Sequence, residues 1–397
     1  MKHLTVWMGE QLAGTWGISK DNTHSFQYDE SYLANDNATP LSRSMPLQST
    51  VFEGSFIHDF FANLLPESEQ IQKNIKARFH APSLNAFDLL AEVGRDTSGA
   101  LRILPEGEDQ LNGERVLTEA ELSGLLKDVL HQRPLTQLSN DECRFTLAGA
   151  QAKIPLRKGQ KRWSIGGIST HIFKVPMGSF GPFALDLSTS VENEYLCMKL
   201  AKELGFPVAE CIIEYVGELP VLVVERFDRK VRNNTTVRIH QEDFCQSTNT
   251  PALKKYESDG GPGIRTIMEI LKDSQNPEQD RKTFFMTQIL FWLLAAIDGH
   301  GKNFSIFLER GGRFRLTPLY DIISAYPVMG NGLDQIHRRK LKMAMAAKGS
   351  KRYYEWNKIQ GRHYIEMGKS LGFDPPSAMG ELTEKIPRTI ERVRREL

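Results

Sequence analysis

Apolar and polar positions in the first 140 residues follow the periods of both strands and helices. Alternating apolar residues predict short strands at 5–8 and 25–28, with turns at Gly14 and Gly17 between them. A longer apolar run predicts a helix over residues 56–65, which ends before a proline. This pattern predicts a first domain, rich in β-structure, that covers residues 1–140.

Two further helices of this domain carry recognisable end signals. The first is predicted over residues 85–93, with Gly94 ending it in the left-handed conformation. The second begins at Thr118, which with Glu121 forms the sequence signature of a capping box, and continues to about residue 130.

The pattern changes near residue 144 to strands, then one helix, then strands. Strands are expected at 145–147, 153–156, 162–165 and 171–175, a helix at 189–204, and strands at 211–216 and 220–225. This is the element order of a kinase small lobe, so residues 141–228 are expected to form one. Residues 229–397 are expected to be mainly helical, apart from a hairpin at 304–316.

A polar cluster stands between two apolar runs, at 289–297 and 304–308. Its residues are Asp298, Gly299, His300, Gly301, Lys302 and Asn303. Four residues separate Asp298 from Asn303, as in a kinase catalytic loop, where the Asp accepts the substrate proton and the Asn holds Mg²⁺. Tyr320 and Asp321 follow beyond the hairpin and offer a second metal contact. An isolated Asp-Gly-x-Gly is more often a plain turn.

Lys174 lies in the predicted strand at 171–175, just before the helix that begins near residue 190. In kinases a strand Lys contacts the α- and β-phosphates and pairs with a helix Glu, for which Glu194 is preferred here over Glu192. The alternative is an edge-strand lysine whose amine lies in water.

Two other segments fit a nucleotide site. The loop Ala148, Gly149, Ala150, Gln151, Ala152 and Lys153 has small residues that let backbone N–H groups approach phosphates, although a hairpin turn explains it equally. Glu225, Arg226, Phe227 and Asp228 mark the change from strands to helices, where a hinge would meet the adenine. Any domain linker has the same appearance.

Composition narrows the class of protein. The 397 residues carry 50 Lys and Arg against 49 Asp and Glu, so any nucleic-acid surface must be local. No apolar run reaches the ~18–20 residues that span a bilayer. The four cysteines have no C-x-x-C spacing, and the N-terminus lacks a signal-peptide pattern. We therefore expect a cytoplasmic protein without a membrane partner.

Basic residues gather late in the chain. Between Arg338 and Arg362 there are nine Lys and Arg residues against one acid, Glu355, with aromatic residues interleaved. Such a patch attracts phosphate backbones of DNA or RNA. A solvated amphipathic helix is the alternative.

These residues together resemble the HipA kinases, the toxin half of a bacterial toxin–antitoxin pair. The resemblance runs through most of the chain and includes the segments 88–96, 147–153, 225–229, 241–246, 256–263, 298–305 and 319–325. It implies an α+β, two-lobed, protein-kinase-like fold related to the phosphoinositide kinases, with an N-terminal β-rich module and a mainly helical C-terminal lobe.

The resemblance also implies residue roles and ligands, ATP and Mg²⁺. Asp298 would be the catalytic base, and Asn303 and Asp321 would hold the metal. Lys174 would contact the phosphates, and His300 to Asn303 would complete the phosphate side. The loop 148–153 would lie near the nucleotide, and Glu225 to Phe227 would meet the adenine.

The implied partners are a dimeric helix-turn-helix antitoxin resembling HipB, its operator DNA, and an aminoacyl-tRNA synthetase as substrate, glutamate–tRNA ligase above all. Lys348, Gly349, Ser350 and Lys351 fall where the family has a DNA-contacting loop. Thr146 stands where family members carry an autophosphorylated Ser, and its hydroxyl keeps that modification chemically possible.

Three functions remain open at this stage. The first is a serine/threonine protein kinase that acts as a toxin, arrests growth and regulates its own transcription with the antitoxin. The second is a catalytically weak co-repressor that binds antitoxin and operator DNA. The third is a small-molecule phosphotransferase, which can share the Asp-x-x-x-x-Asn spacing.

Overall fold

The computed structural model describes residues 2–108, 113–180, 184–232 and 235–396. They divide into two compact units. Unit 1 consists of Met1–Val175, Glu214–Leu253 and Ile306–Phe314, and unit 2 of Pro176–Ile213, Lys254–Ser305 and Arg315–Leu397. The domain boundaries expected after residues 140 and 228 stay predictions.

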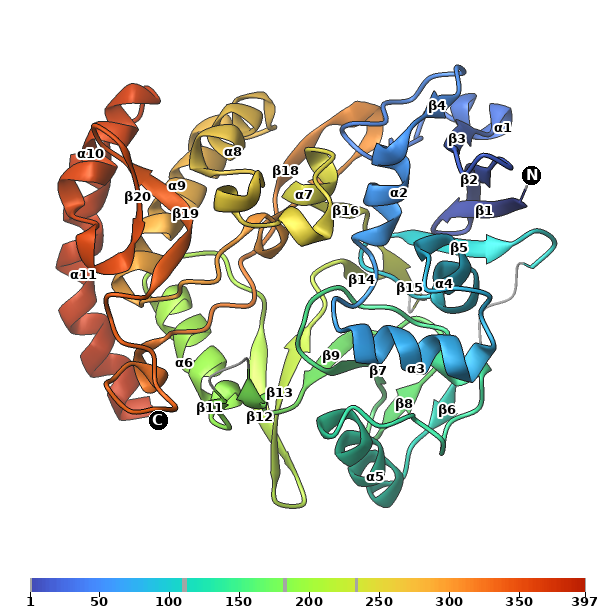
Figure 1. Cartoon of the computed structure of the whole chain (residues 1–397), viewed down its shortest axis with the longest axis horizontal. Coiled ribbons are helices and arrows are strands. Elements are labelled where there is room, and N and C mark those ends of the chain that lie inside the picture. The colour runs from blue at the N-terminus through green and yellow to red at the C-terminus, as the bar shows by residue number, and fades with distance from the viewer. Residues whose placement is uncertain (1, 109–112, 181–183, 233–234, 397) are drawn as a thin grey trace. The chain divides into compact units, whose positions relative to one another are not determined.

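The N-terminal part of unit 1 is an antiparallel sheet with helices packed on it (Figure 1). The strand order is β4-β3-β2-β1-β5. The strands are β1 (Lys2–Met8), β2 (Gln11–Ile18), β3 (His24–Tyr28), β4 (Phe52–Glu53) and β5 (Leu101–Pro105), and the helices α1 (Glu30–Leu33), α2 (Ser55–Ala62), α3 (Glu69–Phe79) and α4 (Ala86–Val93).

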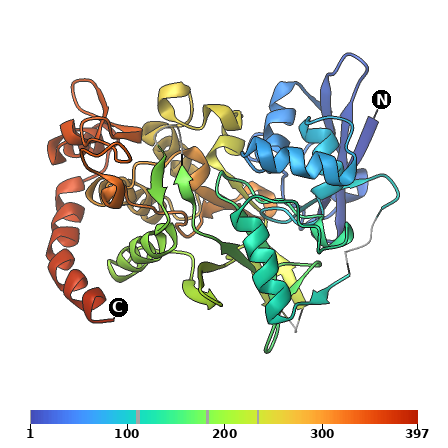
Figure 2. The same cartoon turned by 60° about the horizontal axis from the view of Figure 1, so that its bottom comes forward.

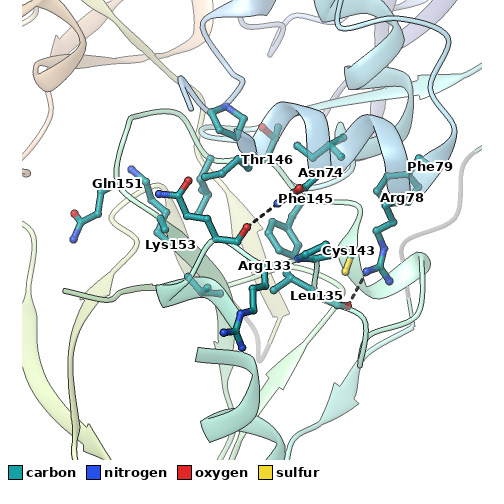
Figure 3. A pocket seen from close by; sticks show the side chains of 18 residues that line it. Asn74, Arg78, Phe79, Arg133, Leu135, Cys143, Phe145, Thr146, Gln151 and Lys153 are labelled. Atoms are coloured by element: carbon teal, nitrogen blue, oxygen red, sulfur yellow. Dashed lines mark hydrogen bonds between the residues drawn. The ribbon is translucent and has the colours of Figure 1, made fainter. Parts of the chain in front are cut away.

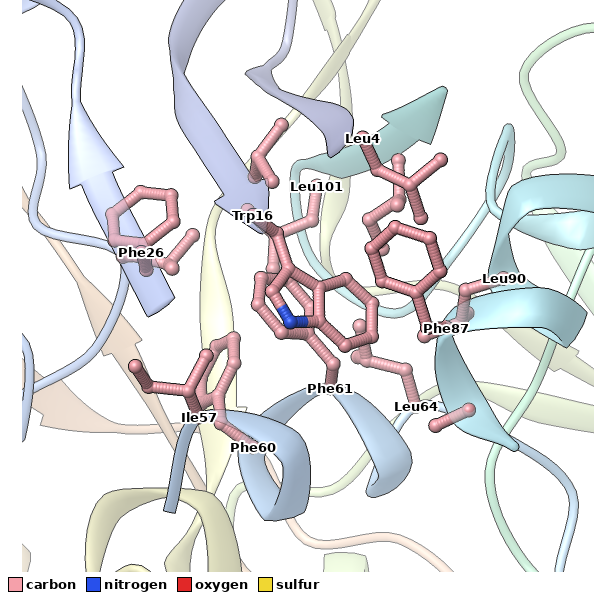
Figure 4. Packing of buried hydrophobic residues seen from close by; sticks show 14 of the residues in the cluster. Leu4, Trp16, Phe26, Ile57, Phe60, Phe61, Leu64, Phe87, Leu90 and Leu101 are labelled. Carbon is pink, nitrogen blue, oxygen red and sulfur yellow. The ribbon is translucent and has the colours of Figure 1, made fainter. Parts of the chain in front are cut away.

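Aromatic stacking fills the core between this sheet and its helices. The Trp16 ring of β2 stacks on Phe61 of α2 with centroids 4.0 Å apart, and Phe87 of α4 meets it edge-on at 4.9 Å (Figure 4). All three rings are buried. Such pairs add stability beyond their buried area, so α2 and α4 are fixed against the sheet.

The predicted turns at Gly14 and Gly17 are wrong, because both residues lie inside β2. Gly14 pairs with Tyr28 on β3 and with Val6 on β1. A Cβ at Gly14 would lie 2.2 Å from the carbonyl oxygen of Gln27. These glycines serve close strand packing rather than turning. Helix α3 was not predicted from the sequence. Its N-cap Ser68 accepts a hydrogen bond from Ile71 N.

The end of α4 corrects a second prediction. Gly94 follows the helix as expected but has φ −78°, outside the left-handed region. A Cβ there would meet the carbonyl oxygens of Leu90 and Ile103 at 2.5 and 2.6 Å. Glycine is therefore required for close backbone approach, not for positive φ. The capping box of Thr118 and Glu121 is confirmed.

A second sheet, in the order β12-β13-β9-β7-β8-β6, follows in the chain. Its strands are β6 (Arg115–Val116), β7 (Lys153–Lys158), β8 (Trp163–Ile165), β9 (His171–Lys174), β12 (Cys211–Val216) and β13 (Leu219–Glu225). Helix α5 (Glu119–Leu130) buries Leu122, Leu125 and Leu126 in the same core as Ile154 of β7 and Phe173 of β9. Residues 145–147 form no strand. Phe145 makes only an isolated parallel bridge to Asp96.

Strands also follow residue 228, where mainly helices were expected. They are β14 (Arg229–Arg232), β15 (Thr235–Arg238), β16 (Gln241–Asp243), β17 (Ser305–Leu308) and β18 (Phe314–Leu316), with the short helix α7 (Phe244–Ser247) after β16. The hairpin of β17 and β18 is the expected one. Asp243 caps α7 through a capping box with Gln246.

Unit 2 carries most of the remaining helices. They are α6 (Ser190–Glu203), α8 (Ile264–Ile270), α9 (Pro277–Leu293), α10 (Gly361–Ser370) and α11 (Pro375–Glu396), with strands β10 (Gly178–Phe180), β11 (Leu185–Leu187), β19 (Lys342–Lys348) and β20 (Arg352–Glu355). Helix α11 runs alongside α6 (Figures 1 and 2), and Lys199 pairs with Glu396 at 3.0 Å. No helix among the described residues is both long and apolar enough to cross a bilayer.

Candidate active site

The segment from Asp298 to Asn303 is a compact loop between α9 and β17. The amide nitrogen of Asn303 donates from its side chain to the carbonyl oxygen of Asp298 at 2.8 Å, and the backbone N–H of His300 donates to the same oxygen at 2.8 Å. The side chains of His300, Lys302 and Asn303 are buried. The Asp298 side chain is 59% exposed. The loop therefore presents one carboxylate on a rigid, buried base.

Two aromatic side chains flank the Asp298 carboxylate. The Tyr256 hydroxyl donates to Asp298 Oδ1 at 2.5 Å, and His300 Nε2 lies 3.8 Å from Oδ2. The two rings pack edge to face with centroids 5.2 Å apart. Burial, together with the charge of Lys255, lowers the pKa of His300 to about 3. The imidazole is therefore neutral near pH 7.

Asp321 follows β18 in the chain. Its charge raises the pKa of His300, against the larger effect of burial. The preceding Tyr320 hydroxyl bonds to the carbonyl oxygen of Lys302 at 2.8 Å and to Ser305 Oγ at 2.5 Å. Asp321 has φ +60°, which is uncommon for a residue with a side chain and concentrates at functional sites.

The oxygen donors in this loop suit a hard cation. Because the Asn303 amide nitrogen is bonded to Asp298 O, its Oδ1 is the atom that remains to act as a ligand. An Asp carboxylate and an amide oxygen are ligands that Mg²⁺ accepts, with phosphates and water completing its octahedron. Among the described residues no group of three or more His, Cys, Asp or Glu gathers as a metal cluster.

Two lysines stand opposite each other in the second sheet of unit 1. Lys174 on β9 pairs in register with Lys153 on β7, so both side chains project from one face. Lys174 is 6% exposed. Like charges directly across a sheet are unfavourable by themselves. Their juxtaposition favours an anion at this face. The alternative of an edge-strand lysine whose amine lies in water does not fit, because Lys174 is buried.

The loop before Lys153 has a fixed shape. Gly149 has φ +105°, and a Cβ there would lie 2.7 Å from Lys153 Nζ. The carbonyl oxygen of Gly149 accepts from Glu67 N at 3.1 Å, and Gln151 Nε2 donates to the carbonyl oxygen of Val175 at 2.8 Å. The loop is thus held at both ends, and only glycine allows the lysine amine to lie against it.

Thr146 and the pocket beneath it lie just before this loop. The Thr146 hydroxyl is buried and donates to the carbonyl oxygen of Leu64 at 2.9 Å. A mostly apolar pocket of about 120 Å³ lies between α3, the end of α5 and the segment around Thr146 (Figure 3). Phe79, Phe145 and Cys143 line it. Phosphorylation at Thr146 would need this segment to leave its place.

The predicted hinge residues have side-chain partners that the sequence did not reveal. Arg226 is buried and pairs with Asp228 at 2.9 Å and with Asp96 at 3.4 Å. Phe227 packs edge-on against Phe307 at 5.7 Å. The backbone N–H of Arg226 is bonded to Thr170 O. The side chains of Arg226 and Phe227 therefore stabilise unit 1, and Glu225 alone is exposed.

Arg226 belongs to a larger buried ion-pair network. Arg229 also bonds to Asp96, at 2.9 Å, and Arg238 lies 3.5 Å from it. Burial alone would raise the pKa of Asp96, but the three guanidinium groups outweigh it and hold that pKa below its ordinary value. The acid belongs to the segment after α4, so the network joins the N-terminal sheet to the second sheet.

The remaining predicted residues lie in unit 2. Glu194 of α6 is buried, whereas Glu192 is exposed. Lys348 ends β19, and Gly349, Ser350 and Lys351 form the turn that leads to β20; both lysines are exposed. The alternative of an amphipathic helix for the basic segment is wrong, because residues 342–355 form a β-hairpin. In β19 five consecutive residues, 343–347, are buried between two exposed lysines, which is not the pattern of a solvated helix.

The described site residues thus fall into two groups. Asp298, His300, Gly301, Lys302, Asn303, Tyr320 and Asp321 gather in unit 2, whereas the loop 148–153, Lys174 and Glu225–Phe227 belong to unit 1. Tyr256 joins the first group without having been predicted there. Its segment, 256–263, contributed only to the family resemblance, because the contact to Asp298 spans 42 positions in the chain.

This α+β architecture, with a β-rich N-terminal module, is that of a protein-kinase-like fold. A family model described as the HipA-like C-terminal domain matches residues 145–395, and one described as the HipA N-terminal domain matches residues 4–104. The chain belongs to the HipA family of serine/threonine kinase toxins. Membership of a kinase family implies the use of ATP.

Individual relatives agree with this assignment. Y4mE of Sinorhizobium fredii, which carries a provisional kinase name, is 32% identical over 99% of this chain and 91% of its own length. The serine/threonine-protein kinase toxin HipA of Shewanella oneidensis is 30% identical over 98% of this chain and 89% of its own. The solved Shewanella complex of HipA, HipB and operator DNA contains a chain with TM-score 0.79 and 25% identity, covering 99% of this chain and 91% of that chain.

Proposed function

We propose that this chain is an ATP- and Mg²⁺-dependent serine/threonine protein kinase and the toxin of a type II toxin–antitoxin pair. The observation that carries the proposal is the loop 298–303, which exposes the Asp298 carboxylate and bonds the Asn303 side-chain nitrogen to Asp298 O, so that Asn303 Oδ1 remains to act as a metal ligand. A proton acceptor and a metal donor then belong to one loop. That is the arrangement phosphoryl transfer requires.

Each residue has a separate task in this mechanism. Asp298 accepts the proton of the substrate hydroxyl as it attacks the γ-phosphorus. Asn303 Oδ1 and the Asp321 carboxylate would hold Mg²⁺, which neutralises phosphate charge when bound. Lys302 places positive charge near the phosphates. In unit 1, Lys174 and Lys153 stand opposite each other in the sheet and form a basic face that suits an anion.

The substrate class is proposed from the family. We infer an aminoacyl-tRNA synthetase, glutamate–tRNA ligase first, whose phosphorylation inhibits translation and promotes growth arrest and persistence. The partner is a HipB-like helix-turn-helix dimer, because the similar Shewanella structure is a complex with HipB and operator DNA. The exposed turn 348–351 supports a contact with the operator phosphates, which would make the pair a transcriptional autoregulator.

Thr146 is proposed as the autophosphorylation site. Its hydroxyl is buried against Leu64 O, and a phosphate of roughly −2 charge cannot stay in such a place. Modification would therefore displace the loop 148–153 and lower nucleotide affinity. The loop's contacts with Glu67 and Val175 are the ones that would break.

The proposal is tested by phosphoryl transfer to purified glutamate–tRNA ligase, measured by mass spectrometry of the intact ligase. We expect wild-type chain with Mg-ATP to add one phosphoryl group to the ligase, and Asp298→Gln to slow transfer by at least ~10²-fold. Asp334→Asn, an exposed acid in the same unit, is the matched control and keeps the wild-type rate. Undiminished transfer by Asp298→Gln would reject the assignment of the base.

A co-repressor without kinase activity is the competing function. It predicts that Asp298→Gln changes nothing, neither phosphate transfer nor repression of a reporter driven by the operator. A panel of small hydroxyl compounds in place of the ligase tests the small-molecule phosphotransferase. Turnover of such a compound with none on protein substrates would support it instead.

A further inference from the structure

The loop at residues 255–263 holds a tyrosine whose hydroxyl touches the proposed base. Tyr256 Oη lies 2.5 Å from Asp298 Oδ1, within the range of a charge-assisted O–H···O⁻ bond. We propose that Tyr256 is a positioning residue, which anchors Oδ1 of Asp298 so that Oδ2 receives the proton of the substrate hydroxyl. This inference rests on the proposed kinase function.

The loop that carries Tyr256 is fixed by several independent contacts. The carbonyl oxygen of Tyr256 accepts from Asp259 N at 3.0 Å and from Gly261 N at 2.9 Å. Gly260 has φ +100°, and a Cβ at Gly261 would lie 2.4 Å from Lys254 O. The succession of glycines is therefore needed to fold the loop back on itself. The position of the Tyr256 backbone is therefore fixed by hydrogen bonds within the loop, independently of its side chain.

Two neighbours of Tyr256 tie this loop to the rest of unit 2. The Glu257 carboxylate accepts from Ala346 N of β19 at 2.7 Å, and burial raises the pKa of Glu257. The carbonyl oxygen of Lys255 accepts from Gly301 N, inside the loop of the base, at 3.2 Å. Tyr256 thus stands between an anchor on β19 and an anchor on residues 298–303.

Asp298 needs such an anchor because its side chain is largely exposed. An exposed carboxylate rotates readily, and only one rotamer aims an oxygen at the reacting hydroxyl. His300 Nε2, at 3.8 Å from Oδ2, lies beyond hydrogen-bond distance. The Tyr256 hydroxyl does lie within hydrogen-bond distance and donates to this carboxylate. It fixes the rotamer and favours the ionised form.

A competing interpretation predicts the opposite effect of Tyr256 on the rate of phosphoryl transfer. The phenol could occupy the place of the substrate hydroxyl and block the base until substrate displaces it. Removing the phenol would then raise kcat/KM. In the positioning role, removal lowers kcat, because the base loses its orientation and is protonated more readily. Kinetics of a single variant separates the two.

The decisive variant is Tyr256→Phe, which keeps the ring against His300 and removes only the hydroxyl. We expect kcat for phosphoryl transfer to fall about 10-fold, the loss expected for one hydrogen bond to a charged group, with KM for ATP unchanged. The acidic limb of the kcat–pH profile should move upward by about one pH unit. The charged groups that face the site, Lys255, Lys302 and Asp321, remain in place, and His300 stays neutral.

Tyr215→Phe, at a largely exposed position of β12, is the matched control and should leave both kcat and the pH profile unchanged. If Tyr256→Phe fails to fold, fluorotyrosine at position 256 replaces it. This more acidic phenol keeps the bond and should move the acidic limb downward.

The positioning role would be overturned if Tyr256→Phe had the kcat of the wild-type chain and the same acidic limb in its kcat–pH profile. A gain in kcat/KM would overturn it as well. Failure of the proposed function looks different. In that case the wild-type chain transfers no phosphate, or Asp298→Gln remains active whatever the result at Tyr256.

Discussion

Two clusters of charged residues in this protein look alike in sequence and behave differently in structure. Asp96, Arg226, Asp228 and Arg229 are all buried and bonded to one another. Asp298 lies on a buried loop but exposes its carboxylate, which accepts a hydrogen bond from a phenol and lies 3.8 Å from a neutral imidazole. The first cluster uses its charges to hold elements together. The second keeps a carboxylate accessible, as a proton acceptor must be.

The comparison separates two meanings of a charged motif. Buried ions that pair with each other stabilise a particular arrangement. Removing one of them leaves its partners as uncompensated charges in a low-dielectric interior. An exposed carboxylate contributes little to stability and can be altered without harming the fold. Measuring the free energy of unfolding and the rate of phosphoryl transfer separately in variants therefore tests whether the two clusters differ in this way.

The largest effect on stability is expected for Arg226→Met. The substitution keeps much of the volume but leaves Asp228 and Asp96 with fewer partners, so the free energy of unfolding should fall by about 3–5 kcal/mol. Urea denaturation followed by circular dichroism measures it. Arg162→Met, at an exposed arginine, is the control and should change the free energy by less than about 0.5 kcal/mol. Equal losses in both variants would contradict a structural role for the network.

A smaller effect, and one that depends on pH, is expected at Glu242. This acid is buried, and its carboxylate accepts hydrogen bonds from Ser42 Oγ at 2.5 Å and from Arg43 N at 3.0 Å. Burial raises its pKa to about 7. A raised pKa means that its contribution is complete below its ordinary pKa of 4.5 and is lost as pH rises through 7. The loss amounts to about 3 kcal/mol.

Denaturation of wild type and Glu242→Gln at several pH values between 4 and 8 measures that loss. The wild-type chain should become less stable relative to the variant as pH rises over this range. The comparison is made with the variant because the half-buried His171 and the buried His240, whose pKa values burial lowers to about 4, act in the opposite direction in both proteins. A pH-independent difference would show that Glu242 does not titrate in this range.

The smallest stability change is expected where the catalytic effect is large. Asp298→Gln should alter the free energy of unfolding by less than about 0.5 kcal/mol, because the carboxylate is mostly exposed. Denaturation of the same preparations used for the transfer assay checks this. A loss of several kcal/mol would place Asp298 with the buried network and remove the contrast between the two clusters.

Local patterns accounted for elements whose signals are short-range. The capping box at Thr118 and the hairpin after Asn303 were readable because a few neighbouring residues determine them. Strand β2 was missed because its glycines resemble turn residues, and only the approach of Gln27 explains Gly14. The β19 and β20 hairpin was missed because its polar content resembles a solvated helix.

The amino-acid sequence by itself determined the chemistry available to this protein. The Asp298 to Asn303 spacing, with Asp321 eighteen residues on, is a local arrangement of side chains that phosphoryl transfer uses. Only the tertiary structure decided which charged residues act and which hold the fold, because that depends on burial and on partners far away in the chain. It buried Arg226 beside Asp96, 130 positions away, and brought Tyr256 to Asp298.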